Sequence, residues 1–307
     1  MISKILQKEV FQWCKSVLDD VAILSDHSKE HGGHKSNTFR LRSSKGNCYL
    51  KIHESRFHWQ NEVQAYTRWA SVFGKHAPRL LAVRDETPLA IIVSELQGKV
   101  VEHVTLTPDQ EKAVWRSAGA LLLRLHELES GTHFGAILKD KSSSVITGAQ
   151  KYMSGKLMKQ LEHALQEGYL DKKEVSTIQT ALDLIPAFEG EKPLPCHRDY
   201  CAANWLVDTE GNWVGVIDFE FAYWDVRVAD FSRDPDWSWM IKPELICAFF
   251  EGYGRQLTEQ EEVQRFIAYV DYALSAIIWG RENAFFGFER EGRDALVHLS
   301  TQITRKD

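Results

Sequence analysis

The 307-residue sequence lacks the features that mark secreted, membrane and zinc-binding proteins. Its five cysteines are scattered and form no C-x-x-C pair, so neither a zinc site nor a disulfide framework is indicated. The N-terminal stretch mixes charges into an amphipathic pattern, without the apolar core of a signal peptide. No stretch approaches the roughly 18 apolar residues of a membrane span. We therefore expect a cytoplasmic protein with no membrane partner.

Positive charge is also in short supply. The net charge of −6 argues against nucleic acid as the main partner. The imbalance is uneven, because residues 1–96 hold 14 Lys and Arg against 10 Asp and Glu, whereas residues 97–307 hold 23 against 33. An acidic half favours a cationic ligand, and ordinary solvated surface charge is the alternative explanation.

Residues 1–96 are predicted to form a sheet with helices. A helical spacing of apolar residues over 5–18 is followed by three short strand patterns within 21–53. Helical spacing returns from Trp59, and residues 89–96 form a continuous apolar run that indicates a buried strand.

Residues 97–307 are predicted to be mainly helical. Thr107 and Pro108 form a capping arrangement at the start of a strong helix. Further helical patterns cover 150–186 and 241–301, and a strand pair with a Gly-containing turn lies between them at 205–217.

The segment 197–204 reads HRDYCAAN, and the predicted strand pair connects it to Asp218 in the sequence IDF. Phosphoryl transfer requires a carboxylate that orients the acceptor hydroxyl and takes its proton, and oxygen ligands for Mg²⁺ beside the phosphates. Asp199 suits the first task. Asn204 and Asp218 suit the second, because Mg²⁺ prefers hard oxygen ligands. A chance match of turn-forming residues is the alternative, which the correctly placed strand pair and Asp218 make the weaker one.

Two upstream side chains fit the same chemistry. Lys51 lies in the strand pattern CYLKIH, where it can neutralise phosphates, and an edge-strand lysine that prevents aggregation is the alternative. Glu62 lies on or beside the apolar stripe of its helix, so it needs a partner. Lys51 is the natural partner, and a solvent-exposed Glu62 is the alternative. Segment 31–37, HGGHKSN, joins two predicted strands and either covers phosphates with its backbone N–H groups or is a flexible turn.

Together these residues resemble the aminoglycoside phosphotransferase and choline kinase superfamily of kinase-like enzymes. The resemblance covers nearly the whole chain in order, and its motifs are the GG-x-x-SN loop, Lys51, Glu62, the hinge SELQG, LLRLHEL at 122–128, the HRD…N loop, D-F-E and Asp230. D-F-E in place of D-F-G, and the lack of an A-P-E motif, are typical of the small-molecule members. Arg198 stands where antibiotic kinases commonly have Gly.

The resemblance implies an α+β, bilobal protein-kinase-like fold. A nucleotide-binding lobe of an antiparallel sheet with a helix is expected over 1–96, and a larger, mainly helical lobe for catalysis and acceptor binding over 97–307. ATP or GTP with Mg²⁺ is the implied phosphate donor, and we expect a monomer or a homodimer.

The resemblance also implies a role for each matching residue. Asp199 is the implied catalytic base, and Asn204 and Asp218 are the implied Mg²⁺ ligands. His197 and Asp230 are implied to support the catalytic loop. The implied nucleotide-binding residues are Lys51, Glu62, Gly32, Gly33, Ser36, Asn37, Ser94, Glu95 and Leu96.

The acceptor is expected beside Asp199. Carboxylates combined with aromatic faces suit a polyamine or a quaternary ammonium ligand. The candidate residues are Asp225, Asp234, Asp236 and Glu282, with Trp224, Trp237, Trp239 and Trp279 close by in sequence. Surface carboxylates and core aromatics are the alternative for each. We predict transfer to a small cationic molecule such as an aminoglycoside or a related antibiotic. The alternatives are a metabolic kinase for choline, an amino acid or a sugar, and a non-catalytic kinase-like binding protein.

Overall fold

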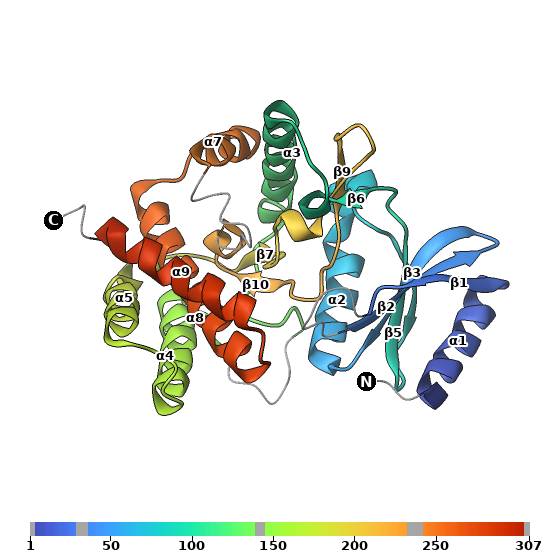
Figure 1. Cartoon of the computed structure of the whole chain (residues 1–307), viewed down its shortest axis with the longest axis horizontal. Coiled ribbons are helices and arrows are strands. Elements are labelled where there is room, and N and C mark those ends of the chain that lie inside the picture. The colour runs from blue at the N-terminus through green and yellow to red at the C-terminus, as the bar shows by residue number, and fades with distance from the viewer. Residues whose placement is uncertain (1–3, 29–35, 139–144, 232–241, 304–307) are drawn as a thin grey trace.

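A five-stranded antiparallel sheet is built from the N-terminal part of the chain (Figure 1). The structure is a computed structural model that describes residues 4–28, 36–138, 145–231 and 242–303. The strand order is β1-β2-β3-β5-β4, with β3 at the centre. The strands are β1 (Val21–Asp26), β2 (Ser36–Ser43), β3 (Gly46–His53), β4 (Leu80–Arg84) and β5 (Leu89–Ser94).

The alternation of side chains along β3 gives the sheet two different faces. Cys48, Leu50 and Ile52 point to one face, where they join a cluster of buried residues under helix α1 (Lys4–Leu18). Tyr49 and Lys51 therefore point to the opposite face. Helix α2 (Arg56–Arg68) contacts β3, β4 and β5.

Helix α2 explains why a carboxylate is buried beside the sheet. Ser55 caps its N-terminus by accepting a hydrogen bond from the backbone of His58. Its buried stripe includes Trp59, Glu62 and Tyr66, which recur at the helical spacing. The helical period that places Trp59 and Tyr66 against the sheet thus also buries Glu62.

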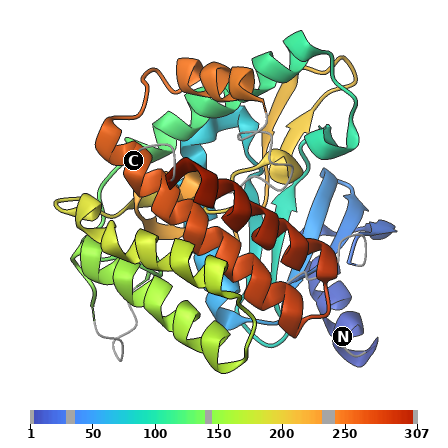
Figure 2. The same cartoon turned by 60° about the vertical axis from the view of Figure 1, so that its left-hand side comes forward.

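The remainder of the chain is mostly helical, as expected from its patterning (Figure 2). Helices α8 and α9 run antiparallel and pack against α4 and α5, and α7 packs along α3. The helices are α3 (Pro108–His126), α4 (Ala149–Gln166), α5 (Lys172–Asp183), α7 (Pro243–Gly252), α8 (Glu259–Glu282) and α9 (Phe286–Ile303). Short 3₁₀ helices are η1 (Ala70–His76), η2 (Val101–His103), η3 (Ile185–Phe188), η4 (Ala202–Asn204) and η5 (Arg227–Phe231).

The predicted helical stretch 150–186 is divided into separate helices. Gly168, at a φ of 68°, follows the end of α4 in the left-handed conformation that terminates helices. Asp171 then caps α5 by accepting hydrogen bonds from the backbone of Lys173 and Glu174. A turn residue and a new cap therefore break the helical pattern.

Short strands lie on either side of the HRDYCAAN segment, residues 197–204. Strands β6, β8 and β9 form one small antiparallel sheet, and β7 pairs with β10 in another. The strand pair predicted at 205–217 is confirmed as β8 and β9, and Gly211 in its turn has a φ of 80°. The strands are β6 (Lys99–Val100), β7 (Leu194–Cys196), β8 (Trp205–Val207), β9 (Trp213–Val216) and β10 (Tyr223–Asp225).

Aromatic side chains join the sheet-bearing part to the helical part. Trp69 follows α2 and packs edge-on against Trp224, with ring centroids 4.9 Å apart. Phe73 and Phe219 pack similarly at 5.7 Å. All four rings belong to one large buried cluster, so a shared core holds the two parts together. Within the described part of the chain, none of the helices combines the length and apolar character needed to cross a bilayer.

Helices α3 and α7 meet at Gly119 and Gly252. A Cβ atom at Gly252 would lie 1.8 Å from the carbonyl oxygen of Arg116, so Gly252→Ala forces the helices apart. We expect the free energy of unfolding to fall by about 1–3 kcal/mol, measured by urea denaturation. Gly155→Ala is the matched control, because its Cβ would meet nothing within 4 Å and Ala favours a helix. Equal stability of the two variants would contradict the close approach.

Candidate active site

A buried lysine connects the sheet to the catalytic segment. The Nζ atom of Lys51 lies 2.8 Å from Oε1 of Glu62 and 2.8 Å from Oδ1 of Asp218. The Lys51 side chain is 8% exposed and that of Glu62 is fully buried. The predicted contact between Lys51 and Glu62 is therefore present. Lys51 lies in a central strand and Glu62 is buried, so the edge-strand and solvent-exposed alternatives are wrong.

The charges in this cluster change one another's pKa. Burial lowers the pKa of Lys51, but Asp218 and Glu62 outweigh that effect and hold the pKa well above its ordinary value. Burial opposes ionisation of Asp218, and the Lys51 ammonium nevertheless lowers its pKa. Burial and the neighbouring Asp218 charge raise the pKa of Glu220 to about 8. At neutral pH, Lys51 is therefore charged, Asp218 is ionised and Glu220 holds a proton.

His53 contacts the second oxygen of Glu62, and the sequence reasoning missed it. Its Nε2 atom lies 3.0 Å from Oε2 of Glu62, and both side chains are fully buried. His53 follows Lys51 by two residues in β3, so both side chains point to the same face. A histidine two residues after Lys51 in the same strand shares its face of the sheet, where Glu62 is predicted to be buried. That pattern identifies His53 from the sequence. Glu62 is thereby held from both sides.

The loop of residues 197–204, the candidate catalytic loop, holds Asp199 and Asn204 together. The side-chain Nδ2 of Asn204 donates to the carbonyl oxygen and to Oδ2 of Asp199, both at 2.9 Å. The backbone N–H of Ile217 donates to the carbonyl oxygen of Asn204 at 3.0 Å. This bond ties the loop to the residue before Asp218. Both Asn204 and the ionised Asp218 offer the hard oxygen donors that suit Mg²⁺.

Asp230 contacts the backbone of the 197–204 loop. Its carboxylate accepts hydrogen bonds from the backbone N–H groups of His197 and Arg198. Arg198 has a φ of 66°, a conformation uncommon for residues other than glycine. The Nε2 atom of His126 lies 2.9 Å from the Asp230 carboxylate, which gives the His of LLRLHEL a structural role. The His197 ring lies 3.0 Å from the carbonyl oxygen of Ile217 and so joins the loop to the same strand end.

Asp225 requires a correction, because it is fully buried. Its Oδ2 atom lies 2.7 Å from Nε of Arg198 and accepts a hydrogen bond from Tyr152. The Arg198 guanidinium also lies 3.7 Å from the ring centroid of Tyr223. The Asp225 carboxylate is committed to this ion pair, so it orients Arg198 and does not face an acceptor.

Among the described residues, the other predicted acceptor residues contact groups other than Asp199. Glu282 lies at the end of α8, half-exposed and 2.6 Å from His163. Trp224 belongs to the buried core, and Trp279 packs against Phe285 and Phe288. The predicted residues outside the described ranges are Asp234, Asp236, Trp237, Trp239, Gly32 and Gly33.

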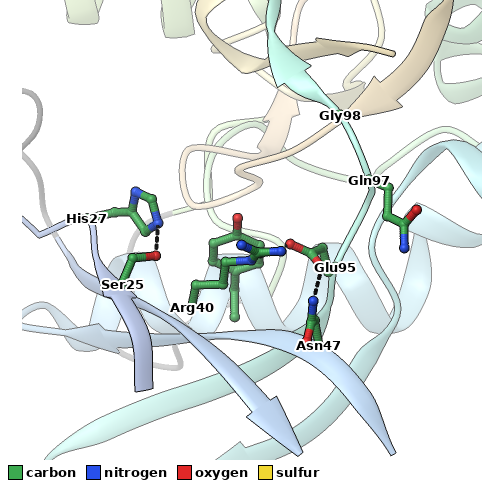
Figure 3. A pocket seen from close by; sticks show the side chains of 8 residues that line it. Ser25, His27, Arg40, Asn47, Glu95, Gln97 and Gly98 are labelled. Atoms are coloured by element: carbon green, nitrogen blue, oxygen red, sulfur yellow. Dashed lines mark hydrogen bonds and ion pairs between the residues drawn. The ribbon is translucent and has the colours of Figure 1, made fainter. Parts of the chain in front are cut away.

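A cavity of about 320 Å³ opens beside the predicted hinge (Figure 3). Its lining residues are Ser25, His27, Arg40, Asn47, Tyr49, Glu95, Gln97 and Gly98. Glu95 is thus the predicted hinge residue that lines it. Ser94 ends β5 and its hydroxyl accepts a hydrogen bond from the backbone of Arg79, and Leu96 is half-buried. Ser36 and Asn37 begin β2, opposite His53 and Ile52.

Comparison with known proteins gives a family and a fold. A family model described as the phosphotransferase enzyme family matches residues 28–266. No protein with a curated description matches the chain in sequence.

The fold recurs in solved structures. A thermostable mutant of aminoglycoside phosphotransferase APH(4)-Ia, in a ternary complex with ADP and hygromycin B, is 14% identical with a TM-score of 0.72, over 95% of this chain and 98% of the other. APH(2")-IIia with GDP and kanamycin is 11% identical with a TM-score of 0.70, over 96% and 99%. A putative aminoglycoside phosphotransferase from Ralstonia eutropha is 12% identical with a TM-score of 0.68, over 97% and 98%. These neighbours confirm the predicted kinase-like fold.

Replacing Asp230 by Asn is expected to loosen the catalytic loop. The substitution removes the charge that two backbone N–H groups and His126 share. We expect a loss of about 3 kcal/mol in the free energy of unfolding, measured by urea denaturation. Asp208→Asn is the control, since Asp208 also accepts hydrogen bonds from two backbone N–H groups, but in an exposed turn. If Asp208→Asn lost as much stability as Asp230→Asn, the buried carboxylate of Asp230 would have no special role in stability.

The raised pKa of Glu220 predicts a pH-dependent stability. The native protein keeps this proton up to about pH 8, whereas an ordinary glutamate, with a pKa of 4.5, loses it at much lower pH. Stability of the nucleotide-free protein therefore falls as pH rises from about 4.5 to 8. Glu220→Gln removes this component, so its Tm relative to wild type should increase steadily between pH 5 and pH 8. The Tm difference between wild type and Glu86→Gln, at an exposed glutamate, should not change with pH. A pH-independent Tm difference for Glu220→Gln would contradict the raised pKa of Glu220.

Proposed function

The chain belongs to the phosphotransferase enzyme family, and we propose that it moves the γ-phosphate of ATP or GTP to a hydroxyl group of a small molecule. The observation that carries this proposal is the double contact of Lys51. One buried ammonium joins Glu62 on α2 to Asp218, which follows the hairpin of the catalytic loop. A binding module has no need of that pair together with Asp199 and Asn204.

In the proposed reaction, Asp199 accepts the proton of the acceptor hydroxyl. The hydroxyl oxygen forms a bond to the γ-phosphorus while the bond to the bridging oxygen breaks, and the nucleoside diphosphate leaves. Lys51 neutralises phosphate charge, and Asn204 and Asp218 are the residues that would hold Mg²⁺. Bound Mg²⁺ supplies charge stabilisation at the phosphate oxygens. Glu62 and His53 keep the Lys51 ammonium in position.

We place the nucleotide in the N-terminal lobe of residues 1–96 and the acceptor in the catalytic lobe of residues 97–307. The cavity beside Glu95 lies at the predicted hinge and is proposed to hold the purine. Solved neighbours carry ADP in one case and GDP in another, which supports a nucleoside triphosphate as donor.

For the acceptor we propose a cationic molecule such as an aminoglycoside or a related antibiotic, which gives the protein a role in resistance in the cytoplasm. The support is that two solved neighbours are complexes with hygromycin B and kanamycin. A metabolic alcohol, such as choline, an amino acid or a sugar, is the second candidate.

The role of Asp199 is tested by Asp199→Asn. Without a carboxylate to take the hydroxyl proton, turnover should fall by roughly 10²–10⁴-fold. Nucleotide binding should remain, because Lys51 and Asp218 are untouched. Release of ADP or GDP is measured with Mg²⁺ against a panel of aminocyclitols, peptide antibiotics, choline and sugars, and nucleotide binding is measured by calorimetry.

Asp208→Asn, in the exposed turn, is the control for Asp199→Asn and should retain wild-type turnover. An unchanged rate in Asp199→Asn would show that another group is the base. Wild-type protein that neither turns over any acceptor nor binds nucleotide with Mg²⁺ would overturn the enzyme proposal.

A further inference from the structure

The cavity beside Glu95 lies on the same face of the sheet as Lys51. Asn47, Tyr49 and Lys51 alternate along β3, so their side chains point to one side. Arg40 stands opposite Tyr49 in the adjacent strand β2. Because Asn47 and Tyr49 line the cavity, the cavity begins one strand repeat, about 7 Å, from the lysine proposed to bind phosphate. A nucleotide held by Lys51 therefore has this cavity within reach of its base.

A charged network forms one wall of the cavity (Figure 3). The Nε atom of Arg40 donates to Oε1 of Glu95 at 2.6 Å, and Nδ2 of Asn47 donates to Oε2 at 2.9 Å. The Glu95 side chain is only 9% exposed, whereas that of Arg40 is 37% exposed. Two residues from the sheet thus hold the carboxylate in a fixed orientation.

Glu95 and Arg40 retain hydrogen-bonding groups that a ligand can use. A carboxylate has about four lone-pair sites, and the contacts with Arg40 and Asn47 occupy two of them. Arg40 uses only Nε in its contact with Glu95, and within the described residues its Nη groups have no hydrogen-bond partner. The wall therefore offers hydrogen-bond acceptors on Glu95 directly beside hydrogen-bond donors on Arg40.

Guanine and adenine differ in how they match this wall. Guanine carries two adjacent donors, N1–H and the 2-amino group, next to the acceptor O6, and arginine is a recognised partner of O6. Adenine offers one amino donor at that edge, and its N1 is an acceptor that would face a negative carboxylate. A carboxylate that receives two hydrogen bonds from guanine thus receives one from adenine and repels the neighbouring nitrogen.

We propose that Glu95 and Arg40 select guanine, so that the phosphate donor of this protein is GTP. This inference rests on the proposed function, because it assumes that the cavity receives the base of the nucleotide. Glu95 accepts from N1–H and the 2-amino group, Arg40 donates to O6, and Asn47 keeps Glu95 oriented.

The test compares the binding of three nucleotides and needs no acceptor. The Mg²⁺ complexes of the β,γ-imido analogues of GTP, ITP and ATP are titrated into the full-length protein by calorimetry. We expect the GTP analogue to bind at least about tenfold more tightly than the ATP analogue, which corresponds to about 1.4 kcal/mol. The ITP analogue, which lacks the 2-amino group, should fall between them.

Two variants connect this preference to the network. Glu95→Gln keeps the shape of the side chain and should reduce the GTP-to-ATP affinity ratio to within about threefold of unity. Arg40→Met should weaken the GTP and ITP analogues, which carry O6, more than the ATP analogue. The matched controls are Glu86→Gln, at an exposed glutamate, and Arg42→Met, at an exposed arginine two residues further along β2, and both should keep the wild-type ratio.

The outcomes separate the inference from the proposed function. Equal or tighter binding of the ATP analogue by wild type overturns guanine selection and leaves phosphotransfer intact. The same follows if Glu95→Gln keeps the wild-type ratio, or if Arg40→Met weakens all three nucleotides equally, which would assign Arg40 to the phosphates. Absence of binding by every nucleotide overturns both proposals.

Discussion

The buried Lys51 ammonium is the interaction on which the rest of the site depends. Its two nearest carboxylate partners come from a helix packed on the sheet and from the segment after the catalytic loop, and Glu220 lies 3.7 Å away. Removing a single partner from such a cluster leaves an uncompensated buried charge, which is strongly destabilising. The position of the sheet relative to the catalytic loop is therefore set by electrostatics as well as by the aromatic core. Folding itself gathers the proposed phosphate-binding group and a proposed metal ligand at one point.

A second set of contacts, made by Asp230 and His126, holds the backbone of the 197–204 loop. Asp230 holds two consecutive backbone N–H groups of the loop, and His126 on α3 contacts the same carboxylate. Burial lowers the pKa of His126, while Asp230 opposes that effect. Tyr253, just after α7, is hydrogen-bonded to the other nitrogen of the His126 ring. Contacts from α3 and from the residue after α7 thus support the segment that carries Asp199.

Much of this arrangement could be predicted because its parts are local in sequence. The HRD…N segment and its strand pair need only a loop and a hairpin to bring Asn204 to Asp199, and the helical period of α2 was enough to predict that Glu62 is buried. The contacts of His126 and the Arg198–Asp225 ion pair join distant segments, so the sequence does not predict them. His53 differs, because it lies close in sequence to Glu62 and a local pattern is enough to find it. Whether a carboxylate such as Asp225 faces solvent or a buried arginine depends on tertiary packing, which neither composition nor spacing contains.

The close approach of α3 and α7 at Gly119 and Gly252 has a consequence for which substitutions this protein can accept. Helix α3 carries His126 and α7 leads to Tyr253, so the separation of these helices determines where the imidazole meets Asp230. Any side chain at either position would widen that separation. A side chain at either glycine is therefore expected to disturb the support of Asp230 from a distance, although neither glycine has a reactive group. The exposed positions around the helical part carry no such steric constraint, so substitutions there leave the packing that holds Asp230 unchanged.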